Sequence, residues 1–250
     1  YITLHHSFEA EQIRVFGTMA KKGYIYKGKK TVYWCPSCET ALAEAEIEYG
    51  EQKTPTIFVK MPIVKDNGQM PAACQGKKAY MVIWTTTPWT MPANLAICLH
   101  PDFSYAVVKT EKGKLIFLES LKDKLLEKFE LSGETIKTYK GHELEGITVR
   151  HVLDSSRTSV IICGNHVTDE DGTGCVHTAP GHGADDFFIG MKYGLKAFCP
   201  VDEKGCLTSE AGKELEGKFV FDANKDVVEM LDKSGHLLKM EWITHSYPHD

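Results

Sequence analysis

Three consecutive threonines form the first segment of this sequence that could do chemistry. Thr85, Thr86 and Thr87 follow an apolar run that ends at Trp84, and Pro88 comes directly after them. Threonine hydroxyls both donate and accept hydrogen bonds, β-branching keeps the side chains stiff, and proline fixes the neighbouring backbone. The pattern therefore predicts a rigid, hydroxyl-lined wall for a small polar ligand, although a threonine-rich strand end before a turn would look the same.

A second unusual segment, residues 172–186, holds two histidines, two aspartates and four glycines within fifteen residues. Glycine lets the backbone approach a ligand closely. Asp185 and Asp186 stand where a helix should begin, a position that favours carboxylates in any case. Taken singly, these aspartates could be helix caps and His177 a packed core histidine. The whole cluster indicates a functional site.

The elements that must position these segments are mostly short strands. Runs rich in β-branched and aromatic residues predict strands at Thr31–Trp34, Thr56–Met61, Ala79–Trp84, Tyr105–Lys109, Leu115–Leu118, Ile147–Val152 and Ser159–Cys163, with a return strand after Leu237. Helical spacing and stop signals predict helices at Ser7–Lys22 (capped by Ser7, with a stripe of Ile13, Phe16 and Ala20), Leu121–Phe129, Asp185–Tyr193 and Asp222–Lys233. Many strands with few intervening helices favour the α+β class, with a β-barrel-like mixed sheet as core and peripheral helices.

The overall charge narrows the class of partner. A formal net charge of -5 and a pI of about 6.1 argue against a protein that wraps nucleic acid electrostatically, so any such contact should be local. We find no apolar run of membrane-spanning length and no signal peptide, and residue 1 is Tyr rather than Met. A piece of a longer cytoplasmic, monomeric protein with no membrane contact is expected, its eight cysteines mostly buried thiols.

Both segments resemble the signature segments of one family, the isoleucyl-tRNA synthetases. Residues 84–94, Trp-Thr-Thr-Thr-Pro-Trp-Thr-Met-Pro-Ala-Asn, and residues 172–186 look like the two signatures of the editing insertion of these enzymes. Residues 32–46 and 245–249 are also similar to the family, so the resemblance spans nearly the whole chain. The related valyl and leucyl enzymes carry Thr-Thr-Arg-Pro where this sequence has Thr-Thr-Thr-Pro.

The resemblance implies a function and a domain plan. It implies a β-barrel editing domain at 49–236, between a flanking segment of the synthetase core at 1–48 and a return strand at 237–250. Such a domain hydrolyses valyl-tRNA(Ile) and excludes isoleucine by size. A second site of this kind is needed because one methylene supplies only ~1–3 kcal/mol of discrimination in a single pocket, and these synthetases are the best-known case. The expected partners are the valine-bearing 3′ end of tRNA(Ile) and the rest of the synthetase. The His-x-Gly-His and Lys-Met-Ser-Lys-Ser signatures are absent, so this segment should not activate amino acids.

The resemblance also implies roles for individual residues. Asp186, rather than Asp185, would bind the α-ammonium group of valine through a charge-assisted hydrogen bond. Thr85, Thr86 and Thr87 would hold the water and the ester and help to wall the side-chain pocket. His177, also placed among the catalytic residues, would limit the size of the pocket and contact the reacting end. No Gly-x-Ser-x-Gly elbow is present, so a positioned water would be the nucleophile. Further contacts to the substrate are expected from Trp84 and Trp89 (stacking on adenine, or core packing), Gly181, His182 and Asn94 (orienting the adenosine, or the threonine loop).

Two other interpretations involve zinc. His177, His182 and an aspartate could form a metal-dependent hydrolase, although their spacing matches no common zinc signature. Cys35 and Cys38 form a Cys-x-x-Cys pair, which is half of a structural zinc knuckle and could belong to a binding module. In some relatives a second cysteine pair completes such a site; here Asp250 stands at its first position. We therefore expect no metal at Cys35 and Cys38, and no cofactor for editing.

Overall fold

A computed structural model of the chain describes residues 1–66, 68, 70 and 79–249, which divide into two compact units, Tyr1–Lys30 and Thr31–Asp250. The first unit carries helix α1 (His6–Lys21), none of whose residues is buried. This helix confirms the predicted one, but Ser7 is not its N-cap. His5 takes that position, and its Nδ1 accepts a hydrogen bond from the Ser7 backbone N–H at 3.3 Å.

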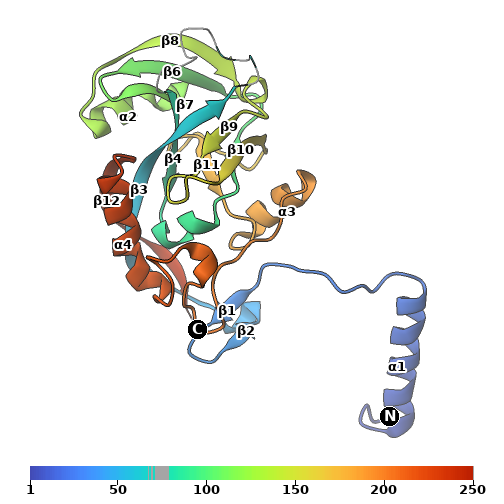
Figure 1. Cartoon of the computed structure of the whole chain (residues 1–250). Helices are drawn as coiled ribbons and strands as arrows, with labels where there is room; N and C mark the ends of the chain where they lie inside the picture. Colours follow the sequence, from blue (N-terminus) through green and yellow to red (C-terminus); the bar gives the residue numbers. More distant parts are fainter. Residues whose placement is uncertain (67, 69, 71–78, 250) are drawn as a thin grey trace. The chain divides into compact units, whose positions relative to one another are not determined.

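The second unit is built on a mixed ten-stranded sheet (Figure 1). Six strands close into a barrel in the described part of the chain, since each pairs with the next and the last pairs back with the first: β3 (Glu48–Lys65), β9 (Thr148–Arg150), β10 (Thr158–Cys163), β5 (Ala96–Leu99), β11 (Cys175–Thr178) and β4 (Ala79–Thr85). The sheet continues beyond β4 through β7 (Gly113–Leu118), β6 (Ser104–Thr110) and β8 (Gly133–Lys140). On the other edge, β12 (Leu237–His249) pairs antiparallel with β3.

The helices of this unit cover the sheet with one apolar face each. Helix α2 (Lys122–Phe129) buries Leu125, Leu126 and Phe129, and α4 (Val220–Lys233) buries Val220, Ala223, Val227 and Leu231, the spacing of an amphipathic helix. The remaining elements are the hairpin of β1 (Tyr33–Cys35) and β2 (Thr40–Leu42), α3 (Ala184–Lys192), and the 3-10 turns η1 (Glu44–Glu46), η2 (Pro88–Ala93), η3 (Glu119–Leu121), η4 (Gly141–Glu143) and η5 (Ser209–Ala211).

The barrel interior explains the sequence of its strands. Strand β3 is exposed at its start but buried from Thr54 to Val59, where β12 pairs with it along one edge and β4 begins to pair with it along the other. All residues of β4 except Trp84 are buried, so both strands read as near-continuous apolar runs. Most of the largest fully buried side chains come from these and neighbouring strands, and one, Met91, comes from the turn that follows β4: Ile57, Met61, Met81, Ile83, Met91, Ile97, Leu99, Tyr105, Leu115, Ile116, Phe117 and Leu118.

The predicted fold class is confirmed, and the predicted strands and helices are all present with shifts of a few residues at their ends, apart from the much longer β3. Four strands were missed: β2 of the small hairpin, and β5, β11 and β8 of the large sheet. Strands β5 and β11 are only four residues long, and β11 lies within the glycine-rich segment. Strand β8 is largely polar because it forms an exposed edge of the sheet. No helix in the described residues is long and apolar enough to cross a membrane.

Candidate functional site

The two unusual segments meet at a cavity of about 500 Å³, a volume typical of small-molecule sites. Strand β4 brings the threonines to it, β11 brings His177, and the first turn of α3 brings Asp186. Strands β4 and β11 are neighbours in the barrel, with Val176 paired to Trp84, which is why segments about ninety residues apart converge. The cavity is lined by Trp84, Thr85, Thr86, Thr87, Trp89, Thr90, His166, Thr168, Asp171, Gly172, Thr173, Gly174, Cys175, Val176, His177, Ala179, His182, Gly183, Asp186 and Tyr247.

The threonine wall is held by hydrogen bonds within its own segment. The Thr85 hydroxyl accepts from the Thr87 backbone N–H at 3.2 Å and lies 3.3 Å from the Thr87 hydroxyl. The Thr90 hydroxyl donates to the Thr87 carbonyl at 2.8 Å. The Thr86 side chain has no hydrogen-bond partner among the described residues, yet it lines the cavity. Its hydroxyl is therefore the one of the three left open for a ligand or water.

His177 is fully bonded within the protein. The Asn94 amide Nδ2 lies 3.0 Å from the Ala96 carbonyl and 2.7 Å from His177 Nδ1. Since this amide group donates to both, His177 Nδ1 must be the unprotonated nitrogen. The proton is then on Nε2, which donates to the Thr90 hydroxyl at 3.0 Å. The network fixes one neutral tautomer of His177 and one orientation of its ring.

Buried and half-buried residues on the side of His177 away from the cavity, Asn94, Ser159 and Arg157, hold this histidine in place. Asn94 is 1% exposed and does not line the cavity, and the Ser159 hydroxyl donates to its Oδ1 at 2.5 Å. The Arg157 guanidinium donates to the backbone carbonyls of Pro92 and Asn94 at 2.7 and 3.0 Å, which anchors the end of η2. The structure therefore places Asn94 behind the wall, in contact with His177 and out of reach of a ligand in the cavity.

Burial gives His177 its electrostatic character. Loss of solvent lowers the pKa of His177 to about 3, with smaller contributions from His182 and His151, so the ring is neutral at physiological pH. Both ring nitrogens already have partners in the protein. A zinc ion could bind His177 only by displacing one of them, which counts against the metal-hydrolase interpretation.

Asp186 has the opposite character. It lies in the first turn of α3, whose N-cap is Gly183. No side chain caps this helix, so the alternative that Asp185 or Asp186 is merely a helix cap is wrong. Asp186 Oδ2 accepts the Ala179 backbone N–H at 3.0 Å, and a Cβ at position 183 would lie 2.9 Å from this oxygen. Burial raises the pKa of Asp186, and no ion pair joins it to any described residue. The result is a partly buried carboxylate suited to a cationic ligand.

The other predicted contact residues are divided between cavity and support. Trp84, Trp89 and His182 line the cavity, and the rings of Trp89 and His182 meet edge to face at 5.0 Å. Burial lowers the pKa of His182 to about 4. Gly181 does not line the cavity; a Cβ there would lie 2.2 Å from the Phe198 carbonyl oxygen. Gly181 thus serves close backbone packing, and no direct ligand contact is shown.

Several cavity residues escaped the sequence reasoning. Thr90 lies within the threonine segment and links Thr87 to His177, but its spacing alone gave no role. His166, Asp171 and Tyr247 come from a loop and from β12, and reach the cavity only through the closed barrel. Tyr247 lies in the family-like segment 245–249, which was given no role at the site, and the sequence near His166 and Asp171 carries no signal for one.

The knuckle segment offers two sulfur donors. Cys35 is buried and Cys38 is exposed, and the Cys38 backbone N–H points to Cys35 Sγ at 3.3 Å. Two thiols are half of a tetrahedral zinc site, and within the described ranges no group of three or more His, Cys, Asp or Glu residues is arranged to hold a metal ion. Asp250, the position of the predicted departure from relatives, lies outside the described residues.

Sequence comparisons identify the relatives of this chain. The family model for class I tRNA synthetases (I, L, M and V) matches residues 1–90. Isoleucine–tRNA ligase from Carboxydothermus hydrogenoformans is 52% identical over 249 residues, which cover 100% of this chain and 26% of the relative. Isoleucine–tRNA ligase 1 from Oceanobacillus iheyensis is 53% identical over 251 residues, covering 100% of this chain and 27% of the relative. The chain thus spans about a quarter of the relatives it matches.

Structural comparisons match the fold alone. The crystal structure of GlLeuRS-CP1 aligns with a TM-score of 0.58 at 15% identity and covers 74% of this chain and 99% of that one. The editing domain of the Plasmodium falciparum cytosolic leucyl-tRNA synthetase gives a TM-score of 0.58 at 10% identity, over 75% of this chain and 99% of its own. With identity above 50% along its whole length, this chain belongs to the isoleucine–tRNA ligase family, as a segment of about a quarter of the ligase.

Proposed function

We propose that this chain hydrolyses the ester bond of valyl-tRNA(Ile), the editing reaction of an isoleucine–tRNA ligase. The single observation that carries this proposal is the arrangement of the cavity. Threonine hydroxyls line one wall, and the carboxylate of Asp186, which forms no ion pair with any described residue, lies at another. An aminoacyl ester presents an ammonium group next to its carbonyl, and this pair of charges and dipoles fits the two walls.

Asp186 is the proposed partner of the α-ammonium group. Burial removes water that would stabilise the charged carboxylate, and the ammonium group would stabilise that charge instead. The hydrogen bond between them would be charge-assisted. One Asp186 oxygen already accepts the Ala179 N–H, so the carboxylate is held in one orientation while its other oxygen binds the ligand. The reacting carbonyl is thereby placed at a fixed distance from the carboxylate.

A water held by the threonine wall is the proposed nucleophile, and Thr86 has the open hydroxyl for it. The water oxygen forms a bond to the ester carbonyl carbon, and the bond from that carbon to the ribose oxygen breaks. The water proton passes to the ribose oxygen, which leaves free valine and an intact 3′ end. Neutral His177 takes no part as a base, because its Nδ1 accepts from Asn94 and its Nε2 carries the proton. The reaction proposed here needs no metal.

Discrimination against isoleucine is assigned to the fixed wall of the cavity. His177 is 8% exposed and bonded at both nitrogens, so it cannot turn aside for a larger side chain. One extra methylene against a close-packed wall costs typically ~1–3 kcal/mol. This exclusion by size acts as a second selection step, which adds to the limited discrimination of a single amino-acid pocket.

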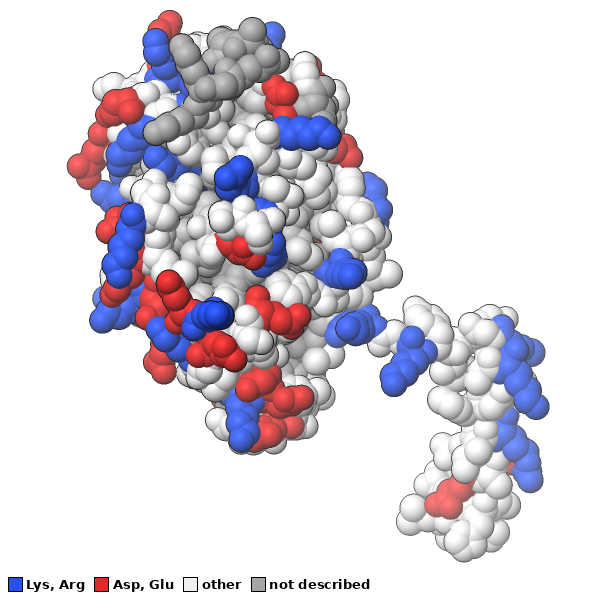
Figure 2. Space-filling model, in the orientation of Figure 1, with Lys and Arg blue, Asp and Glu red and all other residues white. Residues whose placement is uncertain are grey.

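The proposal includes partners and setting. Figure 2 shows acidic and basic side chains interspersed over this face of the Thr31–Asp250 unit, which fits a local contact with one RNA end. We place the reaction in the cytoplasm, with the rest of the ligase delivering the acylated end of tRNA(Ile).

The test is a deacylation assay with valyl-tRNA(Ile) and isoleucyl-tRNA(Ile), run with this chain and with the full-length ligase that contains it. We expect the valyl ester to be hydrolysed well above the uncatalysed rate, and the isoleucyl ester to be spared. If the full-length ligase hydrolyses neither ester faster than the uncatalysed rate, the proposal is rejected.

A further inference from the structure

A second hollow, of about 400 Å³, opens directly beside the candidate site. We name it the α2 groove; it is lined by Thr56, Phe58, Trp84, Thr86, Lys124, Leu125, Lys128, Asp171, Gly172, Glu241, Ile243 and His245. Four of these residues, Trp84, Thr86, Asp171 and Gly172, also line the cavity of the candidate site. The groove is therefore continuous with the cavity.

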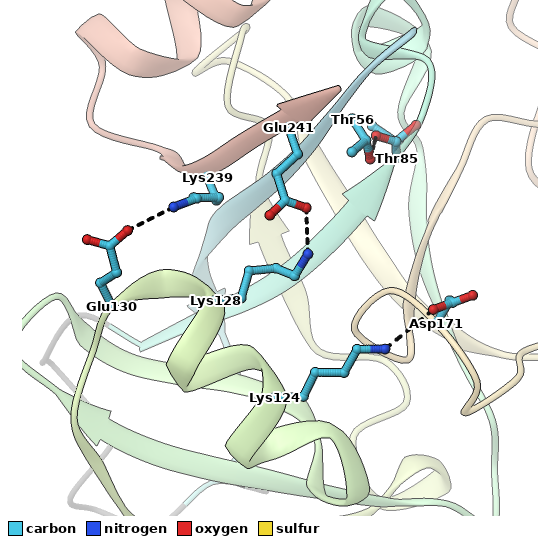
Figure 3. Close-up of polar contacts among 8 residues, drawn as sticks. All are labelled: Thr56, Thr85, Lys124, Lys128, Glu130, Asp171, Lys239 and Glu241. Atoms are coloured by element: carbon cyan, nitrogen blue, oxygen red, sulfur yellow. Dashed lines mark hydrogen bonds and ion pairs between the residues drawn. The ribbon is translucent and has the colours of Figure 1, made fainter. Parts of the chain in front are cut away.

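Two lysines of α2 face this groove and hold acidic partners (Figure 3). Lys124 Nζ lies 3.5 Å from Asp171 Oδ1, and both side chains are more than half exposed. Lys128 Nζ lies 2.5 Å from Glu241 Oε2 on β12, and its side chain is 26% exposed. The Lys124–Asp171 pair is exposed, and exposed pairs are weak, typically ~0–1 kcal/mol, so a phosphate can displace this carboxylate. The Lys128–Glu241 pair is about three-quarters buried, and Glu241 therefore competes more strongly with a phosphate.

The spacing of the lysines gives them a direction. They are four residues apart on one helix face, about 6 Å along the helix axis. Figure 3 shows Lys124 directed toward the loop of Asp171, at the rim of the cavity, and Lys128 directed toward β12. The two ammonium groups thus form a short basic row that leads away from the candidate site.

The ligand chemistry follows from this continuity. The candidate site takes the acylated adenosine, and that adenosine is joined through its 5′ phosphate to the nucleotides before it. These nucleotides must leave the cavity along its surface, and single-stranded RNA is bound by positively charged grooves that follow the backbone. Gly172 widens this path, since a Cβ there would lie 2.7 Å from the Trp84 ring.

We propose that the α2 groove binds the backbone phosphates of the single-stranded nucleotides that precede the acylated adenosine, with Lys124 and Lys128 exchanging Asp171 and Glu241 for phosphate. This inference rests on the proposed function and adds the path of the RNA. It also assigns an effect to the acidic partner: Glu241 competes with phosphate for Lys128, so removing its charge strengthens RNA binding.

Two substrates separate the groove from the site. The valyl ester of adenosine has no phosphate, whereas valyl-tRNA(Ile) carries the phosphates that the groove would bind. In the full-length ligase and in this chain, the Lys124→Gln/Lys128→Gln variant should lose about tenfold in kcat/KM on valyl-tRNA(Ile) and keep its rate on valyl-adenosine. The slope of log affinity against log salt should become shallower by about 1.4, from two contacts at about 0.7 each.

Matched variants give the controls. Lys122→Gln removes a lysine of the same helix that does not line the groove, and both substrates should keep their parent rates. Glu241→Gln should lower KM for valyl-tRNA(Ile) alone. An equal loss on both substrates in the double lysine variant, or no loss on either, would overturn the proposal.

The failure of the proposed function would be visible separately. If the parent protein hydrolyses neither ester, the editing proposal fails, and the groove is judged by equilibrium binding. The probe is an unacylated RNA hairpin that ends in the single strand cytidine-cytidine-adenosine. Weaker binding by the double lysine variant, with Lys122→Gln unchanged, supports the groove; equal binding by the parent and the double variant contradicts it.

Discussion

The two ionisable side chains in the walls of the cavity, His177 and Asp186, differ in how many of their hydrogen-bonding atoms have a partner in the protein. His177 has a partner at each ring nitrogen, and burial lowers its pKa to about 3. Asp186 accepts one backbone N–H, and burial raises its pKa without any compensating ion pair among the described residues. A group whose bonds are all internal can shape a site, whereas one that is left open can bind. The comparison assigns size selection to the first wall and charge recognition to the second.

The largest effect should come from removing the open carboxylate. Asp186→Ala should reduce valyl-tRNA deacylation by about 10–100-fold, the worth of a charge-assisted hydrogen bond of ~1.5–3 kcal/mol. Asp185→Ala is the matched control, because Asp185 is the exposed neighbour that does not line the cavity. Deacylation rates and a circular-dichroism check of folding decide the outcome; a folded Asp186→Ala protein with the parent rate would contradict the charge assignment.

Removing the His177 side chain should change the selectivity between valyl and isoleucyl esters more than the rate on the valyl ester. His177→Ala should allow isoleucyl-tRNA(Ile) to be hydrolysed, since the added space accepts the extra methylene. The same change leaves the buried Asn94 amide without one acceptor and should lower the free energy of unfolding by about 1–3 kcal/mol. His142→Ala, at an exposed histidine that does not line the cavity, is the control. The ratio of the two deacylation rates measures the effect, and an unchanged ratio would move size selection to other residues.

The pH dependence sharpens the same contrast. Only ionised Asp186 binds the ammonium group, so kcat/KM should fall as pH falls through the raised pKa of this carboxyl, above the usual aspartate range near 3.9. His177, with a pKa of about 3, should add no inflection near 6.5. A pH profile of valyl-ester hydrolysis, repeated with His166→Ala, tests both statements. An inflection near 6.5 that survives this variant would count against a neutral, internally bonded His177.

The smallest effect concerns the chain's own affinity for RNA. Its net charge is -5, and the lysines of the α2 groove are paired with carboxylates, so tRNA binding by the chain should be weak at physiological salt. Few phosphate contacts imply a shallow slope, at about -0.7 per contact for a single strand. A binding series across salt concentration checks this expectation. Tight binding with a steep slope would reveal a duplex-binding surface.

The strand pattern predicted the barrel-like sheet, and the family resemblance implied that the two motifs form one site, but neither predicted the hydrogen bonds inside the protein. The apolar run before Thr85 and the cluster before Asp186 mark strand and helix ends, so local pattern was enough to find them. The contact from Asn94 to His177 joins residues 83 positions apart and depends on β5 and β11 being neighbours, which no local pattern encodes. For the same reason the sequence left open whether Asn94 orients the adenosine or the threonine loop, and in the structure Asn94 lies behind the wall, bonded to His177. The α2 groove was not predicted.

The most direct test of the central claim is a binding cycle on Asp186. The probes are valyl-adenosine with an amide in place of the ester, which is not hydrolysed, and the same compound without its amino group. Calorimetry measures both on the parent protein and on Asp186→Asn. The account predicts that losing the amino group weakens binding to the parent by about 10–100-fold and leaves binding to Asp186→Asn nearly unchanged. An equal loss on both proteins would contradict the pairing of Asp186 with the ammonium group.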